Sequence, residues 1–197
     1  LLLNLWSNYL IISKLIFVFL ISFLITLASI LLLRPFAKKV GIVDKPSKRK
    51  IHQGNIPVIG GICIFIGVLI SAILYLRDDD ILMALIVSGF FILLLGFIDD
   101  CYPLPVMLRI IIQFIIVSLM VSYTELRFET FGHSFGLPNQ ISLGLLSYPF
   151  TIVGIVFVTN SFNLMDGADG VTGSLTFLAI MGINIVEILF TDLNLNI

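Results

Sequence analysis

Six long apolar runs occupy most of this 197-residue chain, and they constrain its fold more than any other feature. They cover approximately residues 10–33, 58–76, 81–98, 106–123, 141–158 and 171–190. Each is close to the roughly 20 residues that a helix needs to cross a bilayer, and tilt or local thinning accommodates the shorter runs. The length and all-round hydrophobicity of these runs favour helices over strands in lipid. The expected fold is an all-α, polytopic integral membrane helix bundle with about six transmembrane helices.

The composition supports a membrane protein and excludes several other classes. Hydrophobic residues make up 59% of the chain and charged residues 12%, whereas soluble domains carry about 25% charged residues. The formal net charge of −1 excludes nucleic-acid binding through bulk positive charge. Two cysteines are too few for a disulfide framework or a zinc cluster.

Basic residues are concentrated in one connection, and this concentration orients the predicted bundle. Seven of the eleven Lys and Arg residues lie between Arg34 and Lys50, which the positive-inside rule places in the cytoplasm. Counting spans from this connection places residues 99–105 and 159–170 inside, and the N-terminus outside. The connections rich in chemically capable side chains therefore fall on the predicted cytoplasmic face.

The first predicted inner connection combines the basic cluster with a histidine and ends near Gly60 and Gly61. One interpretation is a topology signal with affinity for anionic lipid. The other is a phosphate-binding loop, in which basic side chains hold anionic groups and the glycines let the backbone approach closely. The glycines would serve equally well as a helix-packing surface. The candidate phosphate ligands are Lys48, Arg49, Lys50 and His52.

Two adjacent carboxylates, Asp99 and Asp100, directly follow the third apolar run. Such a pair is costly at a membrane boundary unless a cation or water shares it, and carboxylates are natural ligands of Mg²⁺. The alternative is simple exposure at a helix end, although acidic residues oppose the dipole there. Arg109 and Gln113 are four residues apart and share one face of the following helix. Arg109 is either an interfacial anchor or a substrate contact.

The third predicted inner connection contains four oxygen-bearing side chains spaced by three residues: Asn160, Asn163, Asp166 and Asp169. At helical spacing these groups lie along one ridge, where they can bind a metal, sugar hydroxyls or a base edge. The next span begins here with its N-terminus, which favours phosphate. A polar turn with small residues for helix packing is the alternative. Together the inner connections indicate Mg²⁺-dependent handling of a phosphorylated substrate at the bilayer surface.

These motifs resemble those of the polyprenyl-phosphate N-acetylhexosamine-1-phosphate transferases. The Asp-x-Pro, Arg-Lys-x-His and Gly-Gly elements within residues 44–61 are similar to the N-acetylglucosamine branch, and residues 99–100 match the family's paired aspartates. Residues 160–170 match the motif Asn-x-x-Asn-x-x-Asp-Gly-x-Asp-Gly throughout. Because later family motifs are absent, we expect residues 1–197 to be a single transmembrane catalytic domain truncated on its C-terminal side, and inactive alone.

The resemblance implies transfer of an N-acetylhexosamine-1-phosphate, with N-acetylglucosamine-1-phosphate expected, from its UDP-sugar to undecaprenyl phosphate. UMP is released, and the lipid-linked diphosphate sugar serves cell-envelope polysaccharide synthesis, such as cell-wall or lipopolysaccharide biosynthesis. The implied cofactor is Mg²⁺, with Mn²⁺ as an alternative. The implied location is the bacterial cytoplasmic (inner) membrane with the site on the cytoplasmic face, and a homodimer is an open option.

The implied site divides into three groups of residues in this chain. The catalytic candidates are Asp99, Asp100 and Asp166. The substrate-binding candidates are Lys48, Arg49, Lys50, His52, Arg109, Asn160 and Asp169. Asn163 is the candidate metal ligand, with a further Asp expected beyond residue 197. The alternatives are a phospho-N-acetylmuramoyl-pentapeptide transferase, a non-catalytic membrane fragment and a transporter, although a transporter would place its polar groups near mid-membrane.

Overall fold

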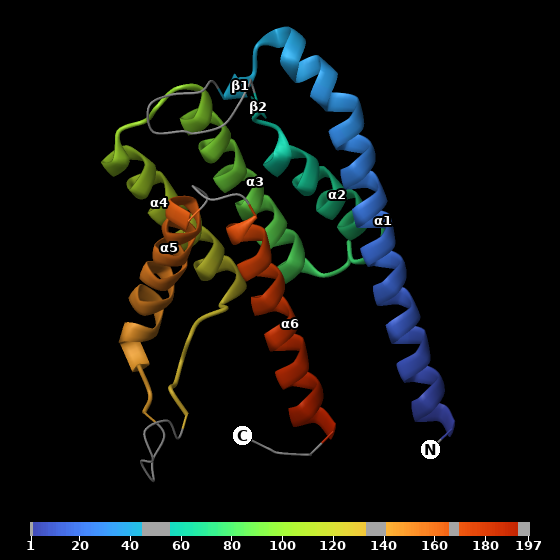
Figure 1. Cartoon of the computed structure of the whole chain (residues 1–197). Coiled ribbons are helices and arrows are strands. Elements are labelled where there is room, and N and C mark those ends of the chain that lie inside the picture. The colour runs from blue at the N-terminus through green and yellow to red at the C-terminus, as the bar shows by residue number, and fades with distance from the viewer. Residues whose placement is uncertain (1, 45–55, 133–140, 166–169, 193–197) are drawn as a thin grey trace. The chain divides into compact units, whose positions relative to one another are not determined.

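The computed structural model describes residues 2–44, 56–132, 141–165 and 170–192, and this part of the chain is mainly helical (Figure 1). The chain divides into two compact units, Leu1–Thr124 and Glu125–Ile197. Within the described residues, four helices are long and apolar enough to cross a membrane, and two more apolar helices are shorter. The predicted polytopic membrane helix bundle is thereby confirmed, with all six apolar runs forming helices.

The first unit contains four helices and a pair of two-residue strands. They are α1 (Leu2–Val40), β1 (Val43–Asp44), β2 (Ile56–Pro57), α2 (Gly60–Tyr75), α3 (Asp80–Cys101) and α4 (Val106–Thr124). Helix α1 is longer than its apolar run, because it continues into a basic last turn that contains Lys38 and Lys39. Cations at a helix C-terminus interact favourably with the helix dipole. The antiparallel pairing of β1 with β2 was not predicted.

Close packing of α1 against α2 depends on a glycine. A Cβ atom at Gly67 would lie 2.6 Å from the backbone oxygen of Ser22 and would overlap the hydroxyl of Thr26. Small residues let transmembrane helices approach closely, and dispersion contacts then hold them together. Nearby, Ala37, Ile59 and Cys63 form a buried cluster between the end of α1 and the start of α2.

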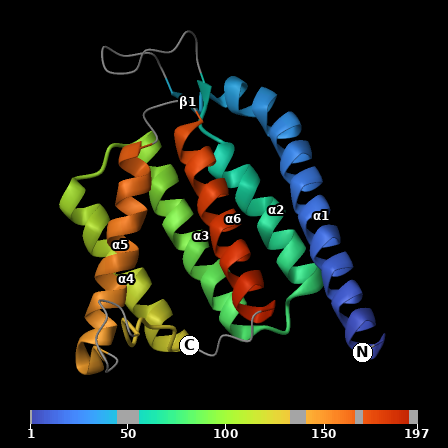
Figure 2. The ribbon, with the colours of Figure 1, turned by 60° about the horizontal axis from the view of Figure 1, so that its bottom comes forward.

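The four helices of the first unit run antiparallel to their sequence neighbours (Figures 1 and 2). In both views the C-terminal end of α1, the β1–β2 pair, the start of α2, and the α3–α4 connection lie at one end of this unit. The described residues that flank the first connection and the α3–α4 connection therefore lie at the same end of the unit, as the span count requires.

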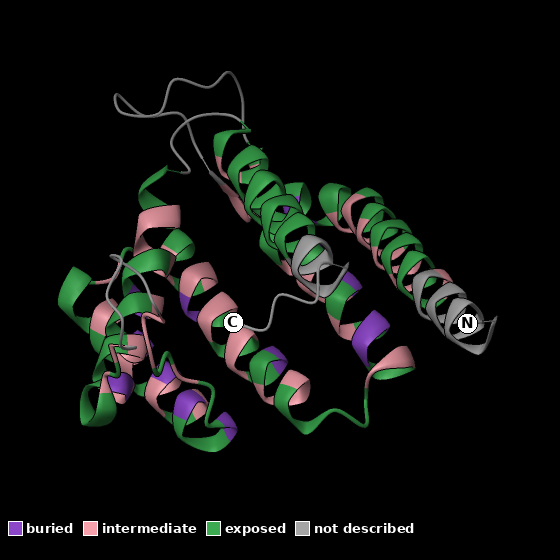
Figure 3. Ribbon diagram, turned by 90° about the horizontal axis from the view of Figure 1, so that it is seen from below, coloured by how far each residue is buried: buried purple, intermediate pink, exposed green. Residues whose placement is uncertain are grey.

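The second unit contains η2 (Gly144–Leu146), α5 (Ser147–Met165) and α6 (Val171–Asp192). Helix α5 begins later than the predicted span at residue 141, because residues 141–143 hydrogen-bond to residues 129–132 around an isolated bridge between Thr130 and Ser142. It also ends later, at Met165 instead of residue 158. Much of the ribbon of the described helices is exposed (Figure 3). The exposed residues include many large hydrophobic side chains, which suits contact with lipid and not with water.

Candidate functional site

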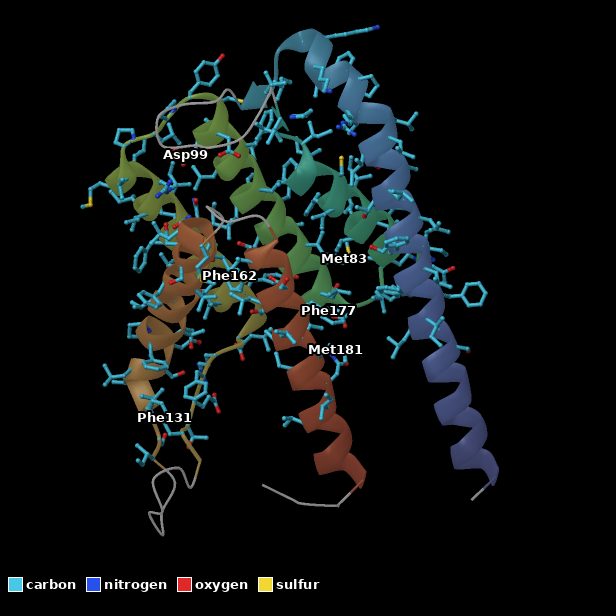
Figure 4. The ribbon with its side chains drawn as sticks, in the orientation of Figure 1. Met83, Asp99, Phe131, Phe162, Phe177 and Met181 are labelled. Carbon is cyan, nitrogen blue, oxygen red and sulfur yellow. The ribbon has the colours of Figure 1, made fainter. Side chains whose placement is uncertain are left out.

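The aspartate pair lies in the last turn of α3, and not in the connection where the sequence analysis placed it. Helix α3 continues through both aspartates to Cys101 and ends before Pro103. Proline disfavours helical geometry in the residue that precedes it, which explains why Tyr102 is extended and terminates the helix. Asp99 lies near the end of α3 (Figure 4). It is partly buried, whereas Asp100 is exposed.

Both carboxylate oxygens of Asp99 have partners in the turn between α3 and α4. Oδ1 accepts a hydrogen bond from the backbone amide of Leu104 at 2.9 Å. Oδ2 accepts one from Nη1 of Arg109 at 2.5 Å. The Arg109 and Asp99 side chains are only 19% and 16% exposed. This ion pair supplies the positive charge that offsets the cost of a carboxylate at a helix C-terminus.

Arg109 lies in the first turn of α4, where its backbone amide donates to the carbonyl of Pro105 at 3.2 Å. Its Nε atom is buried and has no hydrogen-bond partner among the described residues. Gln113, one turn further along α4, is 5% exposed. The prediction that Arg109 and Gln113 share a helix face agrees with the α4 helix in which both lie. The ion pair between Arg109 and Asp99 was not predicted.

The asparagines of the third motif lie within α5, which corrects the prediction of a connection starting at residue 159. Asn160 is half-buried, and its Nδ2 donates to the carbonyl of Val156 at 2.8 Å. The hydroxyls of Thr159 and Ser161 donate to the carbonyls four residues earlier in the same way. Polar side chains that bond to their own helix carry little desolvation cost, so the helix continues through them. Asn163 is exposed.

The connection between α5 and α6 ends at Gly170, which has a positive φ of 77°. Its carbonyl accepts hydrogen bonds from the backbone amide and the hydroxyl of Ser174, at 2.9 and 2.7 Å. Glycine adopts this left-handed conformation at little cost, so it lets the chain turn directly into α6. Asp166 and Asp169 lie outside the described residues, so their predicted place on the ridge is not tested.

The basic candidates also lie outside the described residues: Lys48, Arg49, Lys50 and His52. The flanking residues are described, and they show that β1 and β2 pair antiparallel with Val43 opposite Pro57. Of the two glycines that follow, a Cβ atom at Gly61 would lie 3.0 Å from Leu93 of α3, whereas Gly60 has nothing within 4 Å. Gly61 therefore fits the helix-packing interpretation, and phosphate binding by this loop stays a prediction.

The described residues were compared with the side-chain clusters that usually hold a metal ion. No group of three or more His, Cys, Asp and Glu side chains lies close enough to hold a metal within the described ranges. Asp99, the least exposed of the candidate carboxylates described, is already engaged by Arg109. The candidate ligand Asn163 is exposed, and Asp166 and Asp169 lie outside the described residues, so the predicted magnesium site is not tested.

Comparisons with known proteins give a consistent result. The family model described as glycosyl transferase family 4 matches residues 82–197. A probable undecaprenyl-phosphate N-acetylglucosaminyl 1-phosphate transferase from Bacillus subtilis is 34% identical over 173 residues, which are 85% of this chain and 48% of the relative. Undecaprenyl-phosphate alpha-N-acetylglucosaminyl 1-phosphate transferases from Yersinia pestis and Escherichia coli are each 32% identical, over 83% of this chain and 44% of the relative. The chain thus spans about half the length of these curated relatives. No solved structure matches it.

Proposed function

The chain belongs to glycosyl transferase family 4, and we propose from this that the full-length protein transfers N-acetylglucosamine-1-phosphate from its UDP-sugar to undecaprenyl phosphate. The observation that carries the proposal is the similarity over 83–85% of the chain to transferases named for this acceptor and this sugar. The product is an undecaprenyl diphosphate sugar for cell-envelope polysaccharide synthesis. The names of these relatives favour this activity over transfer of phospho-N-acetylmuramoyl-pentapeptide.

The proposed reaction is a displacement at phosphorus. An oxygen of the lipid phosphate attacks the β-phosphorus of the UDP-sugar, a new diphosphate bond forms, and the bond from the β-phosphorus to the bridging oxygen breaks. UMP leaves with that electron pair. A phosphate monoester has a second pKa near 6, so the acceptor is largely ionised at pH 7 and needs no strong base. Positioning of the two anionic reactants is the main task left to the protein.

The residues proposed for this task bear either positive charge or oxygen ligands. Arg109, together with Lys48, Arg49, Lys50 and His52, would bind phosphates. Asp100 would position the lipid phosphate, Asp166 and Asn160 would lie in the nucleotide-sugar pocket, and Asp169 near the uracil. Asn163 would contribute to a Mg²⁺ site, and the ion, when bound, would neutralise charge on the diphosphate. We also propose that the site lies at the cytoplasmic face of the bacterial inner membrane, as the positive-inside rule indicates.

The test uses the full-length protein in membranes with undecaprenyl phosphate and radiolabelled UDP-N-acetylglucosamine. We expect label to enter the lipid fraction, added UMP to reverse the labelling, and chelation of divalent ions to stop it until Mg²⁺ is restored. UDP-N-acetylmuramoyl-pentapeptide in a parallel reaction should transfer no label. Labelling only from the pentapeptide donor, or from neither donor, would overturn the proposed activity.

A substitution then tests the aspartate pair. We expect Asp100→Asn to abolish UMP release while the protein still inserts into the membrane at the normal level. Asp78→Asn is the matched control, because Asp78 has a side chain 95% exposed and lies on the predicted outer side. Normal turnover in the Asp100→Asn protein would remove this carboxylate from the proposed mechanism.

A further inference from the structure

The two neighbouring aspartates at the end of α3 lie in different environments, although the sequence presents them as an equivalent pair. Asp99 is 16% exposed, and each of its oxygens accepts a hydrogen bond. Asp100 is exposed. A carboxylate whose oxygens are engaged by an amide and a guanidinium is fixed in one orientation. Because Asp100 is open to solvent and Asp99 is largely covered, a bound reactant can reach Asp100 more easily, and the two side chains are suited to different tasks.

The guanidinium of Arg109 offers more donors than Asp99 uses. It has five N–H groups in a rigid planar fork, and the described contact with Asp99 uses Nη1. Its Nε is buried without a hydrogen-bond partner in the described part of the chain. A buried unpaired donor on a charged group is costly, and a phosphate oxygen satisfies such donors well. The carboxylate on one edge also prevents the long Arg109 side chain from sampling other rotamers.

The charges of Asp99, Asp100 and Arg109 also indicate that the two aspartates have different tasks. Two adjacent ionised carboxylates would repel each other and any phosphorylated reactant. Arg109 neutralises Asp99, so the three side chains together carry a single negative charge instead of the two that the aspartates alone would carry. Loss of Arg109 would leave the partly buried Asp99 without its ion pair, next to a second carboxylate.

We propose that Asp99 is a positioning residue: it holds the Arg109 guanidinium in the orientation that binds a substrate phosphate, and Asp100 is the carboxylate of the pair that meets the reacting groups. This inference rests on the proposed function, because it assigns a role in binding the phosphates of that reaction. It differs from a direct role of Asp99, in which a carboxylate oxygen itself contacts the reactants.

The test is a double-mutant cycle in the full-length protein in membranes, with Asp99→Asn, Arg109→Gln and the combination of both. Loss of a hydrogen bond to a charged group lowers kcat/KM by about 10- to 100-fold. We expect either single change to lower kcat/KM for undecaprenyl phosphate or the UDP-sugar by that amount. If Asp99 acts through Arg109, the double variant is no worse than Arg109→Gln alone. A rise in KM for one phosphate substrate accompanies each single change, whereas a purely structural defect lowers only the amount of active protein.

A conservative variant of Arg109 and a second ion pair serve as controls for the double-mutant cycle. Arg109→Lys should recover part of the affinity, because a point charge still attracts phosphate but lacks the planar fork. Arg127 and Glu129 form a second, more exposed ion pair between an arginine and a carboxylate, 2.9 Å between Nε and Oε1, and the hydrogen bond to Glu129 raises the pKa of Arg127. Arg127→Gln and Glu129→Gln should leave both KM values unchanged.

Each result decides between the two roles. The positioning role would be overturned if the losses of kcat/KM from Asp99→Asn and Arg109→Gln multiply in the double variant, or if the loss is confined to kcat. Either result would favour direct action by Asp99. If the neutral variants fail to accumulate, Asp99→Glu and Arg109→Lys form the same cycle and are interpreted by the same rule. Absence of transfer in the wild-type protein would overturn the proposed function and the positioning role with it, whereas transfer with multiplicative effects overturns the positioning role alone.

Discussion

Replacement of Gly67 by alanine should destabilise the protein through the contact between α1 and α2. The new Cβ would lie 2.6 Å from the backbone oxygen of Ser22, whereas a carbon normally approaches a carbonyl oxygen to about 3.3 Å. The helices must therefore separate by about 0.7 Å, and a gap of that size forfeits about a quarter to a half of each dispersion contact across the interface.

The net effect is the difference between two opposing terms. Overpacking typically costs about 1–3 kcal/mol, and the upper end applies because a backbone atom cannot turn away from the new methyl group. Alanine in place of glycine within a helix contributes about 1 kcal/mol in the other direction. The expected net loss is about 2 kcal/mol, which would lower the unfolding midpoint of a 197-residue chain by about 4–8 °C and that of a longer full-length protein by less.

The assay is thermal unfolding of the purified full-length protein in detergent, with Gly96→Ala as the matched control. Gly96 lies within α3, and a Cβ atom there would have nothing within 4 Å. This control should therefore unfold at the wild-type temperature or slightly above it. If Gly67→Ala is as stable as Gly96→Ala, the close α1–α2 approach does not exist in the protein and the reasoning is refuted.

Three further predictions follow from the described contacts and the span count. Asp79 caps α3 by accepting a hydrogen bond from the amide of Leu82 at 2.9 Å. Asp79→Ala should therefore lower the free energy of unfolding by about 1 kcal/mol, and Asp79→Asn should lower it much less. Equal losses of stability in thermal unfolding would contradict the cap. Cys101 is exposed and Cys63 is buried, so of these two thiols a membrane-impermeant maleimide should label Cys101 and not Cys63, and only from the cytoplasmic side. In a Cys101→Ser background, Asn163→Cys should label from that same side, and labelling of the two thiols from opposite sides would end the proposed topology.

The membrane-spanning helices were predictable because they depend on local composition. A run of about 20 apolar residues has one stable state in a bilayer, whatever its neighbours are. The helix ends were less predictable, because hydropathy does not mark them. Helix α1 continues past its apolar run into a basic turn, and α5 starts late because residues 141–143 pair with the preceding segment.

The candidate site was predictable in its residue types and not in its contacts. The spacing of Asn160 and Asn163 along a helix agrees with α5, and the family motifs identified the aspartate pair. The bond between Asp99 and Arg109 was missed, although a signal was present. Pro103 and Pro105 between two apolar runs indicate a tight turn, which brings the end of one helix beside the start of the next.

The sequence by itself determined that the chain spans a membrane and which family its motifs resemble, and under the positive-inside rule it predicted which face carries the chemistry. These properties depend on composition and on the order of residues, so they need no knowledge of packing. Only the tertiary structure decided that Asp99 is engaged by Arg109 while Asp100 is exposed. The reason is that a side chain's partners depend on how two helices meet, and α3 and α4 meet through a turn whose geometry no single residue specifies.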